Sequence, residues 1–219
     1  MTMNAYKIMR KRYYAQGSTV LTKNAQYGNR IRRSTASLAL AEAAIDVCSD
    51  TDATFEQIIN LLQNLQMTRG GFHLPPSVRA HHAERLEPLS IEAPSILAGD
   101  FGATFWESLY ERVRRDEKPS CPSRMDSYFA CRDSESLGRY KAKHWLNKMD
   151  DKLACEITIS DCPVVFEADM VVLDEIDGTM TFASATPQIL RYWNQEFTKR
   201  PIVEALLQGC VVLGAEVEI

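Results

Sequence analysis

The strongest constraint in this sequence is a change of hydrophobic pattern at about residue 150. Before it, apolar residues recur mostly at the three- and four-residue spacings of amphipathic helices. After it, they form strand-like runs over residues 153–159, 163–173 and 210–219. The pattern is thus mainly helical before residue 150 and strand-rich after it, which predicts an α+β fold and not the regular alternation of a doubly wound sheet.

The part before residue 150 is predicted to contain two strands as well as helices. At its start, basic residues are interleaved with aromatic and aliphatic ones, which favours a strand with one solvent-exposed face. Asp133 or Ser134 can cap the last helix of this part. The expected elements are a strand at 4–14, a helical hairpin with apolar stripes at 38–48 and 55–62, a helix at 101–115, a strand at 127–131 and a helix at 134–149.

Turn residues divide the part after residue 150 into further elements. Asp177-Gly178 is a strong hairpin-turn dipeptide and predicts a return strand at 180–183. Thr186 followed by Pro187 predicts the start of a short helix that ends near residue 197, because proline suits the first helical position. Gln208-Gly209 predicts a turn before the last strand.

Residues 34–100 are predicted to form an insertion within a single domain that covers residues 1–219. The insertion follows the first strand, and Gly70-Gly71 ends its helical pattern. Residues 70–100 hold prolines and three of the four histidines without apolar periodicity, so we expect a long loop over the surface. Loops of this length in a compact domain are usually functional or mobile.

Charge and hydropathy disfavour several classes of protein. The 25 Lys and Arg residues against 29 Asp and Glu give a net charge of −4, so a global attraction to nucleic-acid phosphates is missing. The basic patch at residues 30–33 is a weak nucleic-acid candidate, because the helix after it is nearly uncharged. No apolar run reaches the roughly 18 residues that span a membrane, and no standard secretion signal is expected.

The six cysteines indicate free thiols in a reducing cytoplasm. They form no Cys-x-x-Cys pair and have no histidine at ligand spacing, so we expect no zinc or other metal site. A chain of this length does not need disulfides to fold. No Gly-x-Ser-x-Gly motif supports a hydrolytic triad, and neither Gly-x-Gly-x-x-Gly nor a P-loop supports a nucleotide site of those types.

The most informative acid is Glu204, which begins an otherwise apolar run over residues 201–213. Burying a lone carboxylate among aliphatic side chains is costly unless it has a partner or a ligand. Glu204 is therefore either an exposed acid at the first turn of a helix, where the helix dipole favours it, or a buried acid with a chemical role. The spacing leaves both interpretations open.

Three segments, taken in order, resemble the ADP-ribosyltransferase-like superfamily. Glu204, followed by aliphatic residues and a final strand, looks like the closing segment of that superfamily. Pro-Ser-Arg-Met-Asp-Ser-Tyr-Phe-Ala at 122–130 resembles its second element, and Ala-Tyr-Lys-Ile-Met-Arg at 5–10 lies where such enzymes carry a strand with a basic residue. With the runs at 166–170 and 191–193, the combination is similar to a bacterial and phage branch of the superfamily.

The resemblance implies a split, curved β-sheet core that binds NAD as substrate in a cleft. Glu204 would be the catalytic residue, accepting a hydrogen bond from the ribose 2′-hydroxyl and stabilising the oxocarbenium-like charge as the nicotinamide bond breaks. An aromatic ring would stack on nicotinamide, a serine would bind its amide or ribose, and a base would bind the pyrophosphate. The residues that the resemblance places at NAD are Lys7, Arg10, Arg124, Ser127, Tyr128 and Phe129.

Two functions remain open at this point. The first is an ADP-ribosyltransferase-like protein that transfers ADP-ribose to a macromolecular acceptor, expected to be a protein, or hydrolyses NAD. The second is a non-catalytic interaction protein on a degenerate version of the fold, such as a phage or mobile-element inhibitor of a host factor. Lys7 stands where Arg or His is expected, and Ile202 stands where an acceptor-selecting Glu or Gln is common, so both departures favour the second.

Overall fold

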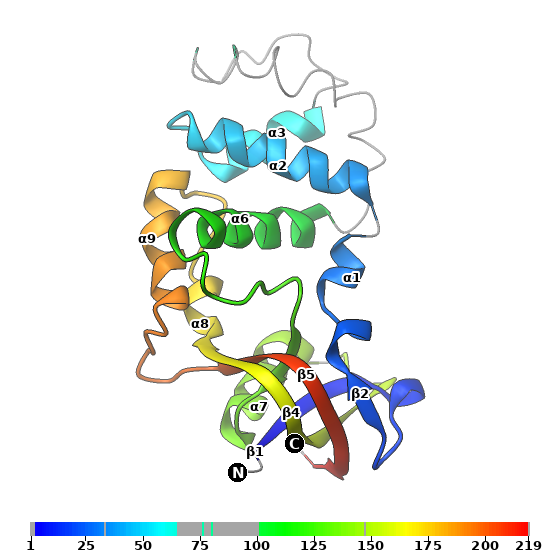
Figure 1. The fold of residues 1–219 in the computed structure, drawn as a ribbon. Coiled ribbons are helices and arrows are strands. Elements are labelled where there is room, and N and C mark those ends of the chain that lie inside the picture. Colours follow the sequence, from blue (N-terminus) through cyan, green and yellow to red (C-terminus); the bar gives the residue numbers. More distant parts are fainter. Residues whose placement is uncertain are drawn as a thin grey trace. The chain divides into compact units, whose positions relative to one another are not determined.

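A computed structural model describes residues 3–32, 34–64, 76, 80, 101–146 and 148–218 (Figure 1). The chain divides into two compact units, and each is described by itself. The first, here called the sheet unit, comprises Met1–Asn29, Pro119–Leu173 and Arg191–Ile219. The second, here called the helical unit, comprises Arg30–Lys118 and Asp174–Leu190, a larger part of the chain than the insertion expected at residues 34–100.

The sheet unit contains a five-stranded sheet whose pairings are all antiparallel. The spatial order is β2-β5-β3-β1-β4, and β4 also pairs with β5. The pairings of β1, β3, β5 and β4 therefore form a closed ring, and only β2 lies outside it. The strands are β1 (Met3–Arg10), β2 (Thr19–Leu21), β3 (Tyr128–Cys131), β4 (Lys152–Asp169) and β5 (Val203–Val217).

An apolar core fills one side of this ring. Because successive side chains of a strand point to opposite faces, alternate residues such as Ala205 and Leu207 of β5 lie in the core. Tyr128 and Ala130 of β3 and Ile157 of β4 join the same buried cluster. The α+β class predicted from the sequence is confirmed, since the sheet is antiparallel and its helices lie between the strands in groups and not in regular alternation with parallel strands.

Strands β4 and β5 are each longer than the sequence pattern suggested (Figure 1). The strand predicted at residues 163–173 instead ends at Asp169, and the short helix α8 (Met170–Asp174) follows. The turn expected at Gln208-Gly209 is also wrong, because the strand continues through it. Gly209 has φ +146°, and a Cβ there would lie 2.0 Å from the Asp161 carbonyl oxygen, so glycine permits close approach of the two strands.

The short elements of the sheet unit correct one further expectation. Asp133 caps α7 (Ser134–Tyr140) by accepting a 2.7 Å hydrogen bond from the Ser136 amide, as one of the two proposed caps. The helix predicted to reach residue 149 continues only as a π-helical turn (Lys141–Trp145), and Leu146 is 65% exposed. Two 3₁₀ turns flank β2, at Lys11–Tyr13 and Thr22–Asn24.

The helical unit is built mainly from amphipathic helices at the predicted positions. They are α2 (Thr35–Ser49), α3 (Phe55–Asn64) and α6 (Phe101–Glu117), and the short α1 (Gly28–Ile31) spans the boundary between the units. Ser34 caps α2 through a 3.1 Å bond to the Ser37 amide. The aromatic rings of Phe55, Phe105 and Trp106 pack edge to face beside one another.

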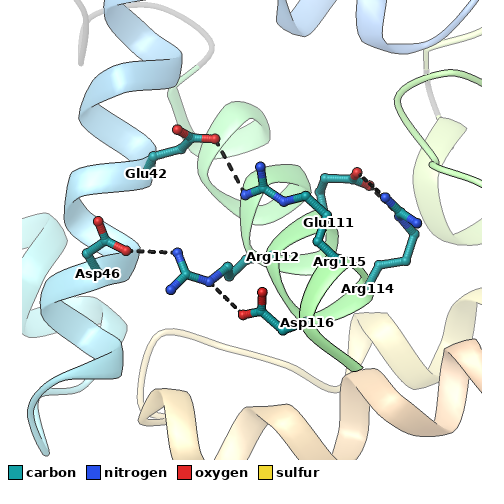
Figure 2. A network of polar contacts seen from close by, with 7 residues as sticks. All are labelled: Glu42, Asp46, Glu111, Arg112, Arg114, Arg115 and Asp116. Atoms are coloured by element: carbon teal, nitrogen blue, oxygen red, sulfur yellow. Dashed lines mark hydrogen bonds and ion pairs between the residues drawn. The ribbon is translucent and has the colours of Figure 1, made fainter. Parts of the chain in front are cut away.

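Ion pairs connect α2 and α6 on the outside of these helices (Figure 2). Arg112 bonds Asp46 at 2.8 Å and Asp116 at 2.7 Å, and Arg115 lies 3.6 Å from Glu42. These charges are partly exposed, so each pair contributes little to stability, typically about 0–1 kcal/mol. We therefore attribute the packing of α2 against α6 to their buried apolar faces.

Helix α9 (Phe182–Trp193) replaces the return strand and the later helix start that the sequence suggested. The Asp177-Gly178 turn is present, since the Met180 amide bonds the Asp177 carbonyl at 3.3 Å, yet the chain then enters a helix. The Thr181 hydroxyl accepts a 3.2 Å bond from the Ser184 amide and thereby caps it. Pro187 consequently lies inside the helix rather than at its start.

Candidate functional site

Glu204 lies near the start of β5, on the face of the sheet opposite the apolar core. Its backbone pairs with Cys131 of β3 and Ala168 of β4, so it occupies the middle of three strands. Because Ala205 points into the core, Glu204 points the other way. The residue is nevertheless only 2% exposed, so the interpretation of an exposed acid at a helix start is wrong.

Arg124 and Tyr192 cover the Glu204 carboxylate. The Arg124 guanidinium forms an ion pair with Glu204 and donates a 2.7 Å hydrogen bond to the Tyr192 hydroxyl. That hydroxyl donates in turn to Glu204 Oε1 at 2.7 Å. Burial raises the pKa of Tyr192 well above its ordinary value, so the phenol remains a donor. The three side chains form a closed, charge-balanced cluster, here called the polar cluster.

Aromatic rings lie on Arg124 as well. The guanidinium carbon is 4.7 Å from the centroid of the Phe129 ring and 5.2 Å from that of the Tyr192 ring. Phe129 also stacks on Tyr27 at 4.8 Å between centroids. Of the predicted residues, the structure thus brings Arg124, Phe129 and Glu204 together.

Ser127 lies close to this group but is occupied by protein partners. Its hydroxyl donates a 2.7 Å hydrogen bond to the Ser123 carbonyl and accepts a 3.2 Å bond from the Gln208 amide nitrogen. Gln208 is four residues after Glu204, so the two project from the same strand about 13 Å apart. Ser127 is fully buried and holds the loop before β3 in place.

Tyr128 and Lys7 lie on the core side of the sheet. Tyr128 belongs to the apolar core, and the Lys7 ammonium lies 4.4 Å from the centroid of its ring. Lys7 also donates a hydrogen bond to the Phe129 carbonyl. Burial lowers the pKa of Lys7 to about 8, and the charges of Cys131 and Glu204 oppose that shift. The hydrogen bond of Lys7 therefore holds the backbone of β3 and not the polar cluster.

Arg10 lies at the end of β1 on the surface. It forms a 3.5 Å ion pair with Asp151, and both side chains are more than half exposed. The structure does not bring Arg10 to Glu204.

A cavity of about 470 Å³ lies beside the middle of β5, in the sheet unit. Gln208, which bonds Ser127, lines it together with Lys23, Asp126 and Asp161. The remaining lining residues are Leu21, Thr22, Gln26, Pro163, Gly209 and Cys210. The volume lies within the range of small-molecule sites. The lining holds one basic and two acidic residues, which suits hydroxyl groups better than a pyrophosphate.

Sequence reasoning assigned no role to Tyr192, Gln208 or Lys23. Tyr192 lies one helical turn after the buried Ile189 on α9, so its burial could have been inferred from the apolar spacing. Gln208 lies four residues after Glu204 on the same strand, so both side chains are on one face of the sheet. The turn expected at 208–209 hid this spacing. Lys23 lies in a short 3₁₀ turn and carries no pattern of its own.

All six cysteines are free thiols, as predicted from their spacing. Within the described parts of the chain, no group of three His, Cys, Asp or Glu side chains is arranged to hold a metal ion. The histidines of the expected loop at 70–100 lie outside the described residues. No described helix is both long and apolar enough to span a membrane.

One family model matches the chain from residue 5 to residue 218, and its description is "Protein of unknown function (DUF2441)". The match runs through segments of both compact units. No curated protein matches the sequence.

Proposed function

The chain belongs to the DUF2441 family, and from the polar cluster we propose that it is an ADP-ribosyltransferase-like protein that uses NAD as substrate. It transfers ADP-ribose to a macromolecular acceptor, expected to be a protein, or hydrolyses NAD. The observation that carries the proposal is the buried carboxylate of Glu204 on the same side of β5 and β3 as the Phe129 ring.

The proposed reaction needs a negative charge near a developing positive one. The bond between the nicotinamide nitrogen and ribose C1′ breaks, its electron pair leaves with nicotinamide, and positive charge grows on the ribose. Water or an acceptor group then bonds C1′ and loses a proton. A carboxylate fixed in a site that excludes water stabilises such charge far better than one in solvent. Glu204 is 2% exposed and held by β5, so it is suited to this task.

The residues around Glu204 support binding of the two ends of a dinucleotide. Phe129 stacks on Tyr27 and also contacts the Arg124 guanidinium, so its ring can take the nicotinamide ring once that guanidinium moves. The cavity at Gln208 offers Asp126 and Asp161 as acceptors for ribose hydroxyls. The separation of roughly 13 Å between Glu204 and Gln208 along β5 favours an extended ligand over a compact one.

Replacing Glu204 by glutamine tests the proposal. We expect nicotinamide release or label transfer from NAD to fall by about 10²–10³-fold, because the amide keeps the shape and removes the charge. Incubation with NAD labelled in the adenylate part, with and without cell lysate, measures transfer, and chromatography measures free nicotinamide. Calorimetric titration with NAD measures binding separately.

Glu167→Gln is the matched control for that experiment. Glu167 lies on the neighbouring strand β4 and forms a 2.5 Å ion pair with Arg132, so the same acid-to-amide change is made outside the polar cluster. Its activity should remain within about twofold of wild type, as expected for a surface change. Wild-type protein that neither binds NAD nor turns it over would falsify the proposal.

A second function is favoured by the closure of the polar cluster. Arg124 is 4% exposed and Glu204 is 2% exposed, so the acid is covered by the chain's own side chains. This arrangement suits a non-catalytic interaction protein in which the cluster only stabilises the sheet. Such a protein should retain one stoichiometric partner in a pull-down, and Glu167→Gln and Glu204→Gln should retain it equally well.

A further inference from the structure

We propose that Phe129, Tyr192 and Glu204 form a binding site for a planar cation and that Arg124 occupies this site from within the chain. The inference rests on the proposed function only in naming the cationic ring of nicotinamide as the natural competitor. In the structure described here, the site is closed by its own arginine. Binding of a planar cationic ligand then requires the Arg124 side chain to leave.

The geometry around Arg124 is that of a bound ligand. The guanidinium lies 4.7 Å from the Phe129 ring and 5.2 Å from the Tyr192 ring, measured to the ring centroids. One nitrogen reaches both the Glu204 carboxylate and the Tyr192 hydroxyl. The Phe129 ring comes from β3, the Tyr192 phenol from α9 and the Glu204 carboxylate from β5. These three groups converge on one cation.

This set of groups selects for planarity as well as charge. A guanidinium is delocalised, weakly hydrated and able to stack on an aromatic face, whereas an ammonium is compact and strongly hydrated. The same properties belong to a pyridinium ring. When the Arg124 guanidinium leaves, the buried Glu204 carboxylate favours another planar cation in its place.

The backbone is held by hydrogen bonds at Arg124 itself and at the residue after it, so we expect the site to open by a movement of the Arg124 side chain. The Ser127 amide bonds the Arg124 carbonyl at 3.2 Å, and the Gly28 amide bonds the Met125 carbonyl at 2.9 Å. A Cβ on Gly28 would lie 2.3 Å from that Met125 oxygen, so the two segments touch through their backbones. Arginine has several rotatable bonds and can leave the site while this loop stays in place.

Arg124→Ala tests the inference with cations added from solution. We expect methylguanidinium and 1-methylnicotinamide to raise the Tm of this variant by about 3 °C or more at concentrations tenfold above their Kd. Tetramethylammonium and sodium chloride at the same ionic strength should have no such effect. Wild-type protein should show no shift with any of the four salts, because Arg124 already fills the site.

Arg124→Lys provides a second variant that keeps a positive charge for Glu204. It should also gain stability from methylguanidinium, because the added cation stacks where lysine cannot. If either variant accumulates unfolded, refolding it with and without methylguanidinium is the measurement, and recovery with the cation alone supports the inference. Failure of planar cations to stabilise or refold both variants would overturn it.

The two proposals can fail separately in these experiments. If the proposed function also holds, Arg124→Ala should bind NAD at least about tenfold more tightly than wild type, since the internal competitor is gone. If planar cations bind Arg124→Ala but neither protein binds NAD, the cation site stands and the NAD function fails. If NAD binds both proteins equally and planar cations bind neither, NAD binding stands and the cation site fails.

Discussion

Replacing Glu204 by leucine is expected to lower the free energy of unfolding by about 3–5 kcal/mol. The change leaves the Arg124 guanidinium buried without the carboxylate that neutralises it, and it removes an acceptor of the Tyr192 hydroxyl. A buried charge that loses its partner keeps its desolvation penalty and loses the attraction that offset it. Urea unfolding of the folded variant, followed by tryptophan fluorescence, measures the loss.

A second substitution in the same background separates charge from packing. Adding Arg124→Met to Glu204→Leu removes both charges and keeps apolar volume, so stability should return to within about 1–3 kcal/mol of wild type. The remaining deficit belongs to the Tyr192 hydroxyl, which loses two partners. Glu167→Leu, at a partly exposed ion pair, should cost less than about 1 kcal/mol. Equal losses in the single and double variants would contradict this account of the polar cluster.

The helices were the most predictable part of the fold. Helices α2, α3 and α6 lie within a few residues of their expected bounds, because a buried face of three- and four-residue period is a local property. The long strands were less predictable. Pro163 and Gly209 are usual breaks in a strand pattern, yet the β4–β5 pairing shifts register at Asp161 and Val164 and absorbs both. Such irregularity depends on how the partner strand pairs, and the local sequence pattern carries no information about that pairing.

The site was only partly predictable, because it too depends on contacts between segments far apart in the sequence. An acid within an apolar run had two interpretations, and only the packing of β3 and β4 beside Glu204 decides between them. Its ion-pair partner, Arg124, is 80 residues away in sequence, and spacing carries no information about such a contact. The resemblance placed Arg124, Phe129 and Glu204 in one site, and these three do lie together. It also placed Lys7 and Tyr128 there, and they project to the core side of the sheet.

Asp169→Ala is expected to cost about 3–5 kcal/mol, an effect comparable to that of losing Glu204. The Asp169 carboxylate is fully buried at the end of β4 and accepts four hydrogen bonds. The donors are the amides of Val171 and Ile202, at 3.0 and 2.9 Å, and the amide and hydroxyl of Thr198, at 2.9 and 2.7 Å. Hydrogen bonds to an ionised acceptor are stronger than neutral ones, and alanine leaves buried donors unsatisfied.

Through these hydrogen bonds, Asp169 holds the segment that leads into β5. Ile202 comes two residues before Glu204, so loss of its bond frees the chain that leads to the acid. We expect hydrogen exchange at the Thr198 and Ile202 amides to quicken in Asp169→Ala, because local opening no longer breaks a bond to the carboxylate. Thr198→Val removes one hydroxyl and should cost only about 1 kcal/mol. Unchanged exchange at both amides in Asp169→Ala would show that other contacts hold this segment, and that Glu204 owes its placement to the strand pairings alone.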